Sequence, residues 1–434
     1  MNKSPLRGAV PTVALAALLV LAMLGTLHAS TRAARPVGIV PQVWEATADG
    51  GLADVLIVLE DQADLSGAHA LSSREGRLRY VYDALRRVAL SSQGPVRAEL
   101  EVAGADYRAF YVVNAIAARV DRDLLMRLGA RPEVGRIVAN PTVRQEQPEP
   151  STVPLEPQGT AGIEWNVLQI NAADVWAMGF NGHGVVIGGQ DTGYDWRHPA
   201  LIEQYRGYNG VTATHDYNWH DAIHTDNSDC GADSPVPCDD RGHGTHTMGT
   251  IVGDDGGSNR IGVAPGAEWI GCRNMEEGRG TPASYVECFE FFLAPYPVGG
   301  NPFTDGEPSL APHVINNSWT CPPREGCAPE TLAAVVENVR AAGIMVVVSA
   351  GNSGSKCGSV EDPPAIYEAA FSVGATDIGD TIAGFSGRGP VTMDGSGRRK
   401  PDVAAPGVGV RSCLQNGGYG TMSGTSMAGP HAAG

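Results

Sequence analysis

The sequence predicts an α/β fold, a mainly parallel sheet with helices on both faces, preceded by a small α+β domain. Apolar runs without strict alternation recur after residue 162, at Val185–Gly189, Trp269–Arg273, Val314–Asn317, Ile344–Ser349 and Ala370–Val373. Strands covered on both faces show this pattern. Thr331–Ala342 precedes one of these runs and spaces its apolar residues as a helix does. Helices between buried strands favour a parallel sheet.

The region from Asp54 to Val138 predicts the small α+β domain. Its expected elements are a strand, a long helix bent near Gly94-Pro95, two further strands, a short helix and a last strand, at Val55–Leu59, Arg74–Val102, Tyr107–Val113, Ala115–Val120, Arg122–Leu128 and Val134–Val138. The order β-α-β-β-α-β is that of a ferredoxin-like domain. We place this domain at residues 36–145.

Composition and charge narrow the class of protein. The chain has 434 residues, 42% hydrophobic and 18% charged, which is enough to bury sizeable cores. Its formal net charge of −17 makes nucleic acid an unsuitable partner, because phosphate binding needs clustered Lys and Arg. Lys3 and Arg7, the apolar run from Ala9 to Leu24 and the small residues up to Ala29 predict a signal peptide at residues 1–29. An uncleaved anchor is the alternative, but Pro11 and the small-residue exit disfavour a stable membrane anchor.

The cysteines indicate an exported domain, and a proline-rich stretch indicates where that domain begins. All eight Cys lie in the second half, from Cys230 to Cys413, as in an exported protein with disulfides. Cys230 with Cys238, and Cys321 with Cys327, would close short loops, although the pairing stays open. Zinc ligation is the alternative, but no C-x-x-C doublet occurs. Residues 146–161 carry four Pro and predict an exposed linker before a domain at 162–434, an arrangement typical of a proprotein.

Three motifs carry polar residues that chemistry could use. Asp191 follows a buried strand and precedes Thr-Gly, where a simple turn is the alternative. His243 lies at a predicted helix start in Gly-His-Gly-Thr-His, and although His246 follows at H-x-x-H spacing, the zinc-protease Glu is missing. Ser426 lies among small residues in Gly-Thr-Ser-Met-Ala, where it could instead be a helix cap. In chain order the three give Asp, His, Ser, one of the known orders of a catalytic triad.

With these three motifs in this order, the sequence resembles the subtilisin-like serine proteases, the subtilases. The resemblance runs from about Trp165 to the last residue and extends to four further segments, at Gly262–Ala267, Val314–Trp319, Ser349–Gly354 and Lys400–Gly407. Gln169–Tyr194 and the segment around Trp319 look most like the bacillopeptidase F branch of the family.

The resemblance implies a secreted, self-processing endopeptidase with a subtilisin-like fold. Asp191, His243 and Ser426 would form its triad, Asn352 would stabilise the oxyanion, and protein or peptide substrates would pair with a cleft lined by Ser318, Trp319, Thr320, Ser349, Ala350 and Gly351. The 36–145 domain would be a propeptide that inhibits the enzyme intramolecularly. The resemblance implies no cofactor for the chemistry. An inactive binding protein with the same fold and a metallopeptidase remain the alternatives.

Several residues depart from the family's pattern. Gln190 replaces an apolar residue before Asp191, Gly387 interrupts the Phe385–Pro390 motif, and Thr320 stands where Gly is usual and could narrow the specificity pocket. Between His215 and Arg241 the aspartates could hold a structural calcium ion, or simply form a solvated acidic loop. Gly434 follows soon after Ser426, so we expect the natural protein to continue and the chain as given to be poorly stable.

Overall fold

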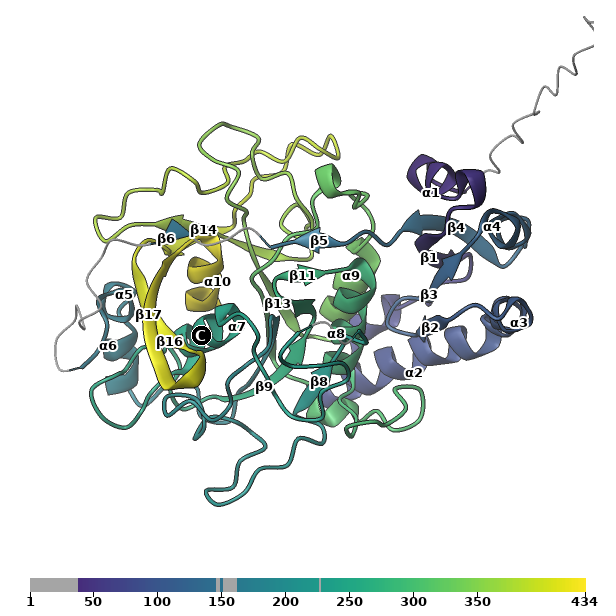
Figure 1. The fold of residues 1–434 in the computed structure, drawn as a ribbon. Coiled ribbons are helices and arrows are strands. Elements are labelled where there is room, and N and C mark those ends of the chain that lie inside the picture. The colour runs from purple at the N-terminus through teal and green to yellow at the C-terminus, as the bar shows by residue number, and fades with distance from the viewer. Residues whose placement is uncertain (1–37, 146–148, 151–161, 226–227) are drawn as a thin grey trace, which may run out of the picture. The chain divides into compact units, whose positions relative to one another are not determined.

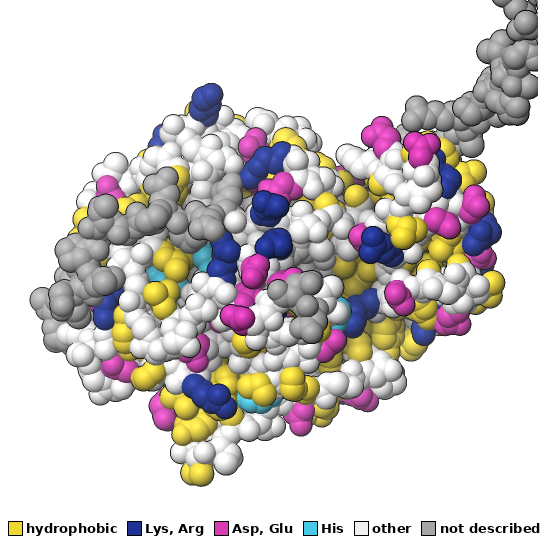
Figure 2. Space-filling view, viewed as in Figure 1, with side chains coloured by type: hydrophobic (Ala, Val, Ile, Leu, Met, Phe, Trp, Pro, Cys, Tyr) yellow, Lys and Arg dark blue, Asp and Glu magenta, His cyan; other side chains and the backbone are white. Residues whose placement is uncertain are grey.

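The computed structural model describes residues 38–145, 149–150, 162–225 and 228–434. The expected signal peptide and most of the expected linker lie outside the described residues. No helix among the described residues is long and apolar enough to cross a membrane. On the face drawn in Figure 2, Lys and Arg side chains lie interspersed with Asp and Glu side chains.

The N-terminal region is an antiparallel α+β unit, as the sequence predicts (Figure 1). Its elements are α1 (Pro41–Ala46), β1 (Ala53–Leu59), α2 (Arg74–Ser92), α3 (Gly94–Ala103), β2 (Tyr107–Phe110), β3 (Ala115–Val120), α4 (Arg122–Gly129) and β4 (Val134–Ala139). The strand order is β2-β3-β1-β4, and every neighbouring pair is antiparallel. The expected long helix is divided into α2 and α3 at Gly94-Pro95, because Pro95 has no N–H to continue the ladder of α2.

Side-chain caps fix where two of these helices begin. The Ser73 hydroxyl accepts a hydrogen bond from the Gly76 amide at the start of α2, and Asp121 Oδ1 accepts one from the Leu124 amide at the start of α4. The second strand is shorter than predicted. The expected strand Tyr107–Val113 ends at Phe110, because the next two amides, Tyr111 and Val112, bond to a carboxylate from a distant helix instead of a neighbouring strand.

The larger part is built on a seven-stranded sheet in the order β15-β14-β13-β12-β7-β9-β8. All six pairs of neighbours are parallel. The strands are β7 (Val186–Asp191), β8 (Trp219–Asp221), β9 (Glu268–Arg273), β12 (Val314–Asn317), β13 (Met345–Ser349), β14 (Phe371–Thr376) and β15 (Val403–Pro406). The five predicted strands are all present, with ends shifted by up to three residues.

Helices cover both faces of this sheet, as predicted. On one face, α7 (His243–Val252) and α10 (Thr425–Ala433) pack side by side, and Met248 and Ala428 lie in one core with Val347. On the other face, α8 (Pro282–Leu293) and α9 (Ala333–Ala341) lie in a second core with Val346 and Val348. Successive side chains of β13 therefore lie in opposite cores. Because both faces of the strand are buried, its apolar residues are continuous.

Shorter elements complete the structure. They are α5 (Trp165–Gln169), α6 (Ala172–Ala177) and the small strands β5 (Val143–Arg144), β6 (Glu149–Pro150), β10 (Met275–Glu276), β11 (Arg279–Gly280), β16 (Val410–Leu414) and β17 (Gly418–Ser423). Three disulfides join Cys230 to Cys238, Cys272 to Cys288 and Cys321 to Cys327, whereas Cys357 and Cys413 are free. Both short loops suggested by the cysteine spacing are therefore closed in the structure.

Candidate active site

Asp191 and His243 form a buried hydrogen-bonded pair. Asp191 is the last residue of β7, so its side chain lies at the carboxyl edge of the parallel sheet, where functional groups of such sheets gather. Its Oδ1 accepts hydrogen bonds from His243 Nδ1 at 2.8 Å and from the Thr192 amide at 2.8 Å. Both side chains are almost completely buried. A proton on Nδ1 leaves the lone pair on His243 Nε2 as the basic position of the ring.

His243 is the first residue of α7. Gly242 precedes it with φ +84°, a left-handed conformation that suits glycine and turns the chain sharply into the helix. Among the described residues, no group makes a hydrogen bond to His243 Nε2. Within the described residues, the basic nitrogen of His243 is therefore free to accept a proton or a hydrogen bond.

Ser426 lies in the first turn of α10, which packs against α7. Its hydroxyl donates to the Ser318 carbonyl oxygen at 3.2 Å, and it forms no hydrogen bond with His243 Nε2. The structure thus contains the Asp–His pair of the predicted triad and brings the helix that carries Ser426 beside it, without a hydrogen bond between His243 and Ser426. Hydrogen bonds of this kind are often loose outside a substrate complex, and rotation about the Cα–Cβ bond redirects a serine hydroxyl.

Asn352 is oriented by the residue next to Ser426. Its Oδ1 accepts hydrogen bonds from the Thr425 amide and the Thr425 hydroxyl, both at 2.9 Å. Because a backbone N–H can only donate, the atom facing it must be the amide oxygen. Nδ2 consequently points away from Thr425, and no described residue accepts a hydrogen bond from it. An N–H donor is thus available beside Ser426.

A small pocket adjoins these residues. It is lined by Ser426, Asn352 and Thr425 together with five of the six predicted substrate-cleft residues, Ser318, Trp319, Thr320, Ser349 and Gly351. The sixth, Ala350, is buried, and its amide bonds to the Val373 carbonyl in β14. The indole of Trp319 stacks on Tyr285 with ring centroids 3.9 Å apart, which fixes one wall of the cleft.

Gln145, at the end of the N-terminal region, enters the same pocket. Its Nε2 lies 2.9 Å from His243 Nδ1 and 3.3 Å from both Asp191 Oδ1 and the Ser318 carbonyl oxygen. The two amide hydrogens can be donated to these two oxygens. The sequence gives no motif at Gln145, and its only signal is its position at the border between the small domain and the linker.

Short strands before and after residues 146–148 pair with strands of the larger part. β5 pairs antiparallel with β11, opposing Val143 to Gly280, and the Gln145 amide donates to the Gly278 carbonyl at 2.8 Å. β6 pairs antiparallel with β17, only a few residues before Ser426. The described residues before and after 146–148 are therefore both extended and paired with strands of the larger part.

Two glutamates of α8 bind the N-terminal region. Glu290 Oε2 accepts hydrogen bonds from the Tyr111 and Val112 amides at 2.5 and 3.0 Å, and burial raises the pKa of Glu290 to about 8 against the effect of these amides. Glu287 lies 3.1 Å from Arg108 and also accepts from His220 and His224. Burial alone would raise the pKa of Glu287, but these hydrogen bonds hold it well below its usual range.

The surroundings of Gln190 and Gly387 account for two of the three departures from the family's pattern. Gln190 is fully buried, donates to Asn317 Oδ1 at 2.7 Å and accepts from Asn274 Nδ2 at 2.8 Å, so its amide is satisfied. A Cβ on Gly387 would lie 2.6 Å from the Ala350 carbonyl oxygen, which explains the glycine.

His246, the second histidine of the H-x-x-H pair, contacts a backbone carbonyl. His246 is buried beside the Val410 carbonyl at 3.1 Å, and burial lowers its pKa to about 3. Among the described residues, no group of His, Cys, Asp or Glu is arranged to hold a metal ion.

In the acidic loop, Asp221 and Asp240 each lie 3.1 Å from Arg273, which is buried. This ion pairing was not visible in the sequence, because Arg273 lies inside a strand far along the chain.

Comparison with known proteins agrees with this geometry. Residues 182–434 match the model of the subtilase family. Over 338 residues the chain is 39% identical to bacillopeptidase F of Bacillus subtilis (strain 168), covering 74% of this chain but 22% of that protein. Over 273 residues it is 31% identical to subtilisin BL of Lederbergia lenta, covering 63% of this chain and 82% of the relative. The chain thus spans about a fifth of bacillopeptidase F and most of subtilisin BL. The family match over more than half of the chain shows that it belongs to the subtilases, a family of serine endopeptidases.

Proposed function

We propose that this chain is the precursor of a secreted serine endopeptidase that cleaves itself before it acts on other proteins. Asp191, His243 and Ser426 are its catalytic triad and Asn352 is its oxyanion donor. The observation that carries the proposal is the 2.8 Å hydrogen bond between Asp191 and His243 beside Gln145, which lines the pocket that also holds Ser426 and Asn352.

The reaction follows from the chemistry of these groups. The Ser426 hydroxyl attacks the carbonyl carbon of a peptide bond while His243 Nε2 takes its proton. Asn352 Nδ2 and the Ser426 amide donate hydrogen bonds to the oxygen as it becomes negative. The C–N bond then breaks, the leaving nitrogen receives the proton from His243, and water releases the acyl group by the reverse sequence. Asp191 holds the ring and stabilises the imidazolium.

The proposed precursor has four parts. Residues 1–29 are a signal peptide, 36–145 a propeptide, 146–161 a linker and 162–434 the catalytic domain. The pairing of β5 with β11 and of β6 with β17 supports this division, because strand pairing on both sides of the proposed border is the way in which an extended peptide substrate would bind. We infer that the bond cleaved during maturation lies between Gln145 and Glu149.

The propeptide acts as an intramolecular inhibitor in this proposal. Gln145 occupies the space beside Asp191 and His243, and Glu290 and Glu287 hold Tyr111, Val112 and Arg108. Cleavage of one bond leaves these contacts intact, so the propeptide remains bound until it dissociates or is degraded.

Active-site labelling tests the proposal. We expect the matured protein to react covalently with a fluorophosphonate probe, and Ser426→Ala to abolish both the labelling and self-cleavage. Ser396→Ala, at an exposed position, is the matched control and should behave as the wild type. Mass spectrometry of the new amino terminus would locate the cleaved bond. Labelling that persists in Ser426→Ala would contradict the proposal, because another residue would then be the nucleophile. A folded wild type that neither labels nor cleaves would also contradict it and would favour a binding protein.

Metal removal provides a second test. The proposed chemistry needs no cofactor, so excess EDTA should leave the initial rate of fluorophosphonate labelling unchanged in freshly prepared enzyme. A slow loss of activity that parallels unfolding would indicate a structural calcium ion, whereas immediate loss of turnover without any labelling would point to a metallopeptidase.

Secretion, which the three disulfides support, is tested by finding the matured form outside the cell.

A further inference from the structure

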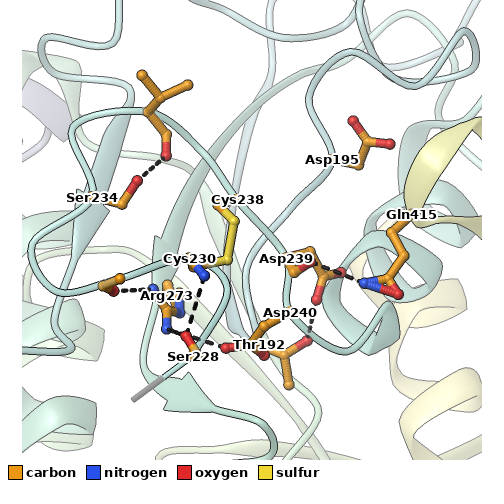
Figure 3. The surroundings of a disulfide bond; sticks show 12 residues. Thr192, Asp195, Ser228, Cys230, Ser234, Cys238, Asp239, Asp240, Arg273 and Gln415 are labelled. Carbon is orange, nitrogen blue, oxygen red and sulfur yellow. Dashed lines mark hydrogen bonds and ion pairs between the residues drawn. A yellow bond between two sulfur atoms is a disulfide. The ribbon is translucent and has the colours of Figure 1, made fainter. Parts of the chain in front are cut away.

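A single carboxylate outside the proposed triad connects the segments that carry Asp191 and His243. Asp239 Oδ1 accepts hydrogen bonds from the Thr192 hydroxyl at 2.9 Å and from the Arg241 and Gly242 amides at 3.0 and 2.8 Å. Its Oδ2 accepts from the Thr245 amide at 3.0 Å and the Thr245 hydroxyl at 2.6 Å. Figure 3 shows Asp239 and Thr192 next to each other. Five donors therefore converge on one side chain.

These donors belong to the two segments that must be aligned. Thr192 directly follows Asp191, whereas Gly242 and Thr245 flank His243 at the start of α7. The Thr192 hydroxyl also accepts a hydrogen bond from the Gly244 amide at 3.1 Å. The first turn of α7 is thus capped by groups from outside the helix, since its own cap residue, Gly242, has no side chain. The caps also tie the helix to the turn after β7.

Asp239 is itself held by the disulfide loop. Cys238 precedes it and is bonded to Cys230, while the Cys238 carbonyl accepts a hydrogen bond from the Tyr194 amide at 3.2 Å. A Cβ on Gly193, which has φ +109°, would overlap that carbonyl oxygen, so the loop and the turn after Asp191 touch closely. Gln415 donates to the Asp239 carbonyl at 3.0 Å, as Figure 3 shows.

The other end of the loop is fixed by Arg273. This buried side chain donates to the Ser228 hydroxyl at 2.7 Å, the Gly231 carbonyl at 3.0 Å and Asp240 Oδ2 at 3.1 Å. Asp239 therefore lies between two anchored points, the disulfide on one side and the Arg273–Asp240 pair on the other. Because its backbone is held on both sides, the Asp239 carboxylate resists displacement.

We propose that Asp239 is a positioning residue for the peptidase reaction, and that the Cys230–Cys238 loop is the support that holds it. Through Thr192 and the first turn of α7 it sets the distance and angle between the Asp191 carboxylate and the His243 ring. The inference rests on the proposed function, since it concerns the same triad. Asp239 is not among the residues that line the pocket of Ser426 and Asn352, so its loss should lower kcat and leave KM nearly unchanged.

The test compares variants in the full precursor. Asp239→Asn keeps the size of the side chain but replaces one acceptor oxygen with an N–H₂ group, and Thr192→Val removes the hydroxyl at constant shape. We expect each to slow self-cleavage and to lower kcat on a peptide substrate by about 10- to 100-fold, since small misplacement of reacting groups has effects of this size. Thr192→Ser, which keeps the hydroxyl, should restore most of the loss.

The matched control is Asp240→Asn, because Asp240 is the next residue of the same loop but bonds to Arg273 and the Glu277 amide. It should lower the melting temperature without lowering kcat of the folded enzyme. A downfield proton resonance from His243 Nδ1–H, compared in Ser426→Ala precursors, should move in Asp239→Asn and not in Asp240→Asn. A merely structural role would leave that resonance and kcat unchanged after correction for the folded fraction.

The outcomes separate the two hypotheses. A wild type that neither self-cleaves nor labels refutes the proposed function and this inference with it. A fully active wild type with unchanged kcat in both Asp239→Asn and Thr192→Val overturns the inference alone. Equal losses of kcat in Asp239→Asn and Asp240→Asn that follow their melting temperatures also overturn it.

Discussion

Glu290 provides the most direct test of how the N-terminal region is held. Its carboxylate is buried and accepts the Tyr111 and Val112 amides, which are themselves fully buried. Glu290→Ala leaves both N–H groups without this acceptor, at a cost of about 1–3 kcal/mol each. Solvent entering the space left by the side chain would recover part of this, so we expect a total loss of about 2–4 kcal/mol.

The assay uses Ser426→Ala as the background, so that the proposed self-cleavage cannot interfere. Hydrogen exchange at the Tyr111 and Val112 amides reports the local change, and urea unfolding reports the change in free energy. Glu290→Gln is the matched control, because its amide oxygen can still accept both hydrogen bonds. Unchanged exchange at these two amides in Glu290→Ala would refute the reasoning, since the amides would then be protected by something other than this side chain.

The same site predicts a dependence on pH. Burial raises the pKa of Glu290 in the folded precursor to about 8, from an ordinary value of 4.5. A raised pKa means that the folded state binds the proton more tightly, so its contribution to stability is complete below pH 4.5 and is lost as the pH rises through about 8. Over this window we expect a loss of about 3–5 kcal/mol. Glu290→Gln should flatten the curve, and parallel curves for the two proteins would contradict the predicted ionisation.

Four further predictions concern the catalytic domain. Asn352→Ala should reduce kcat by about 10²–10³ with little change in KM, a magnitude known for the corresponding donor of subtilisin and not calculated from this structure. Replacing Cys272 and Cys288 together by Ala opens a loop with a sequence separation of 16 and should lower the free energy of unfolding in urea by about 3 kcal/mol. Arg273→Met leaves the Asp221 and Asp240 carboxylates buried without their cation, which should cost about 3–5 kcal/mol, and adding Asp240→Asn should restore part of it. Gln190→Leu should cost about 2–4 kcal/mol in thermal or urea unfolding, because Asn317 Oδ1 and Asn274 Nδ2 lose their partner; an unchanged stability would show that water replaces it.

Local patterns were sufficient to predict much of the fold. The run at Val346–Val348 predicted a strand with both faces covered, and the structure places these side chains in two cores. Gly94-Pro95 predicted a bend in one long helix, and the structure divides the helix into α2 and α3 at this point, because proline lacks the N–H that a helix needs. In both cases the physical cause acts within a few residues, so the sequence displays it directly.

Contacts between distant segments were not predictable in the same way. Tyr107–Val113 has the composition of one strand, yet β2 ends at Phe110 because Glu290, far along the chain, takes the next two amides. Gln145 gave no motif, although it lies against Asp191 and His243. The triad motifs predicted which side chains belong together but not the state of the site, in which Ser426 bonds to Ser318 instead of His243.

Gln190 illustrates why single departures from a family's pattern are hard to interpret. Read alone, a buried amide in a central strand should destabilise the sheet, because an unpaired polar group in a core is costly. Asn274 and Asn317 come from the connections and strands on either side of β7, and each supplies the partner that Gln190 needs. The three amides are therefore one compensated set, and the stability of each depends on the other two. A substitution at any of them is best judged against the other two, and the same reasoning makes Asp239 interpretable only together with Thr192 and Thr245.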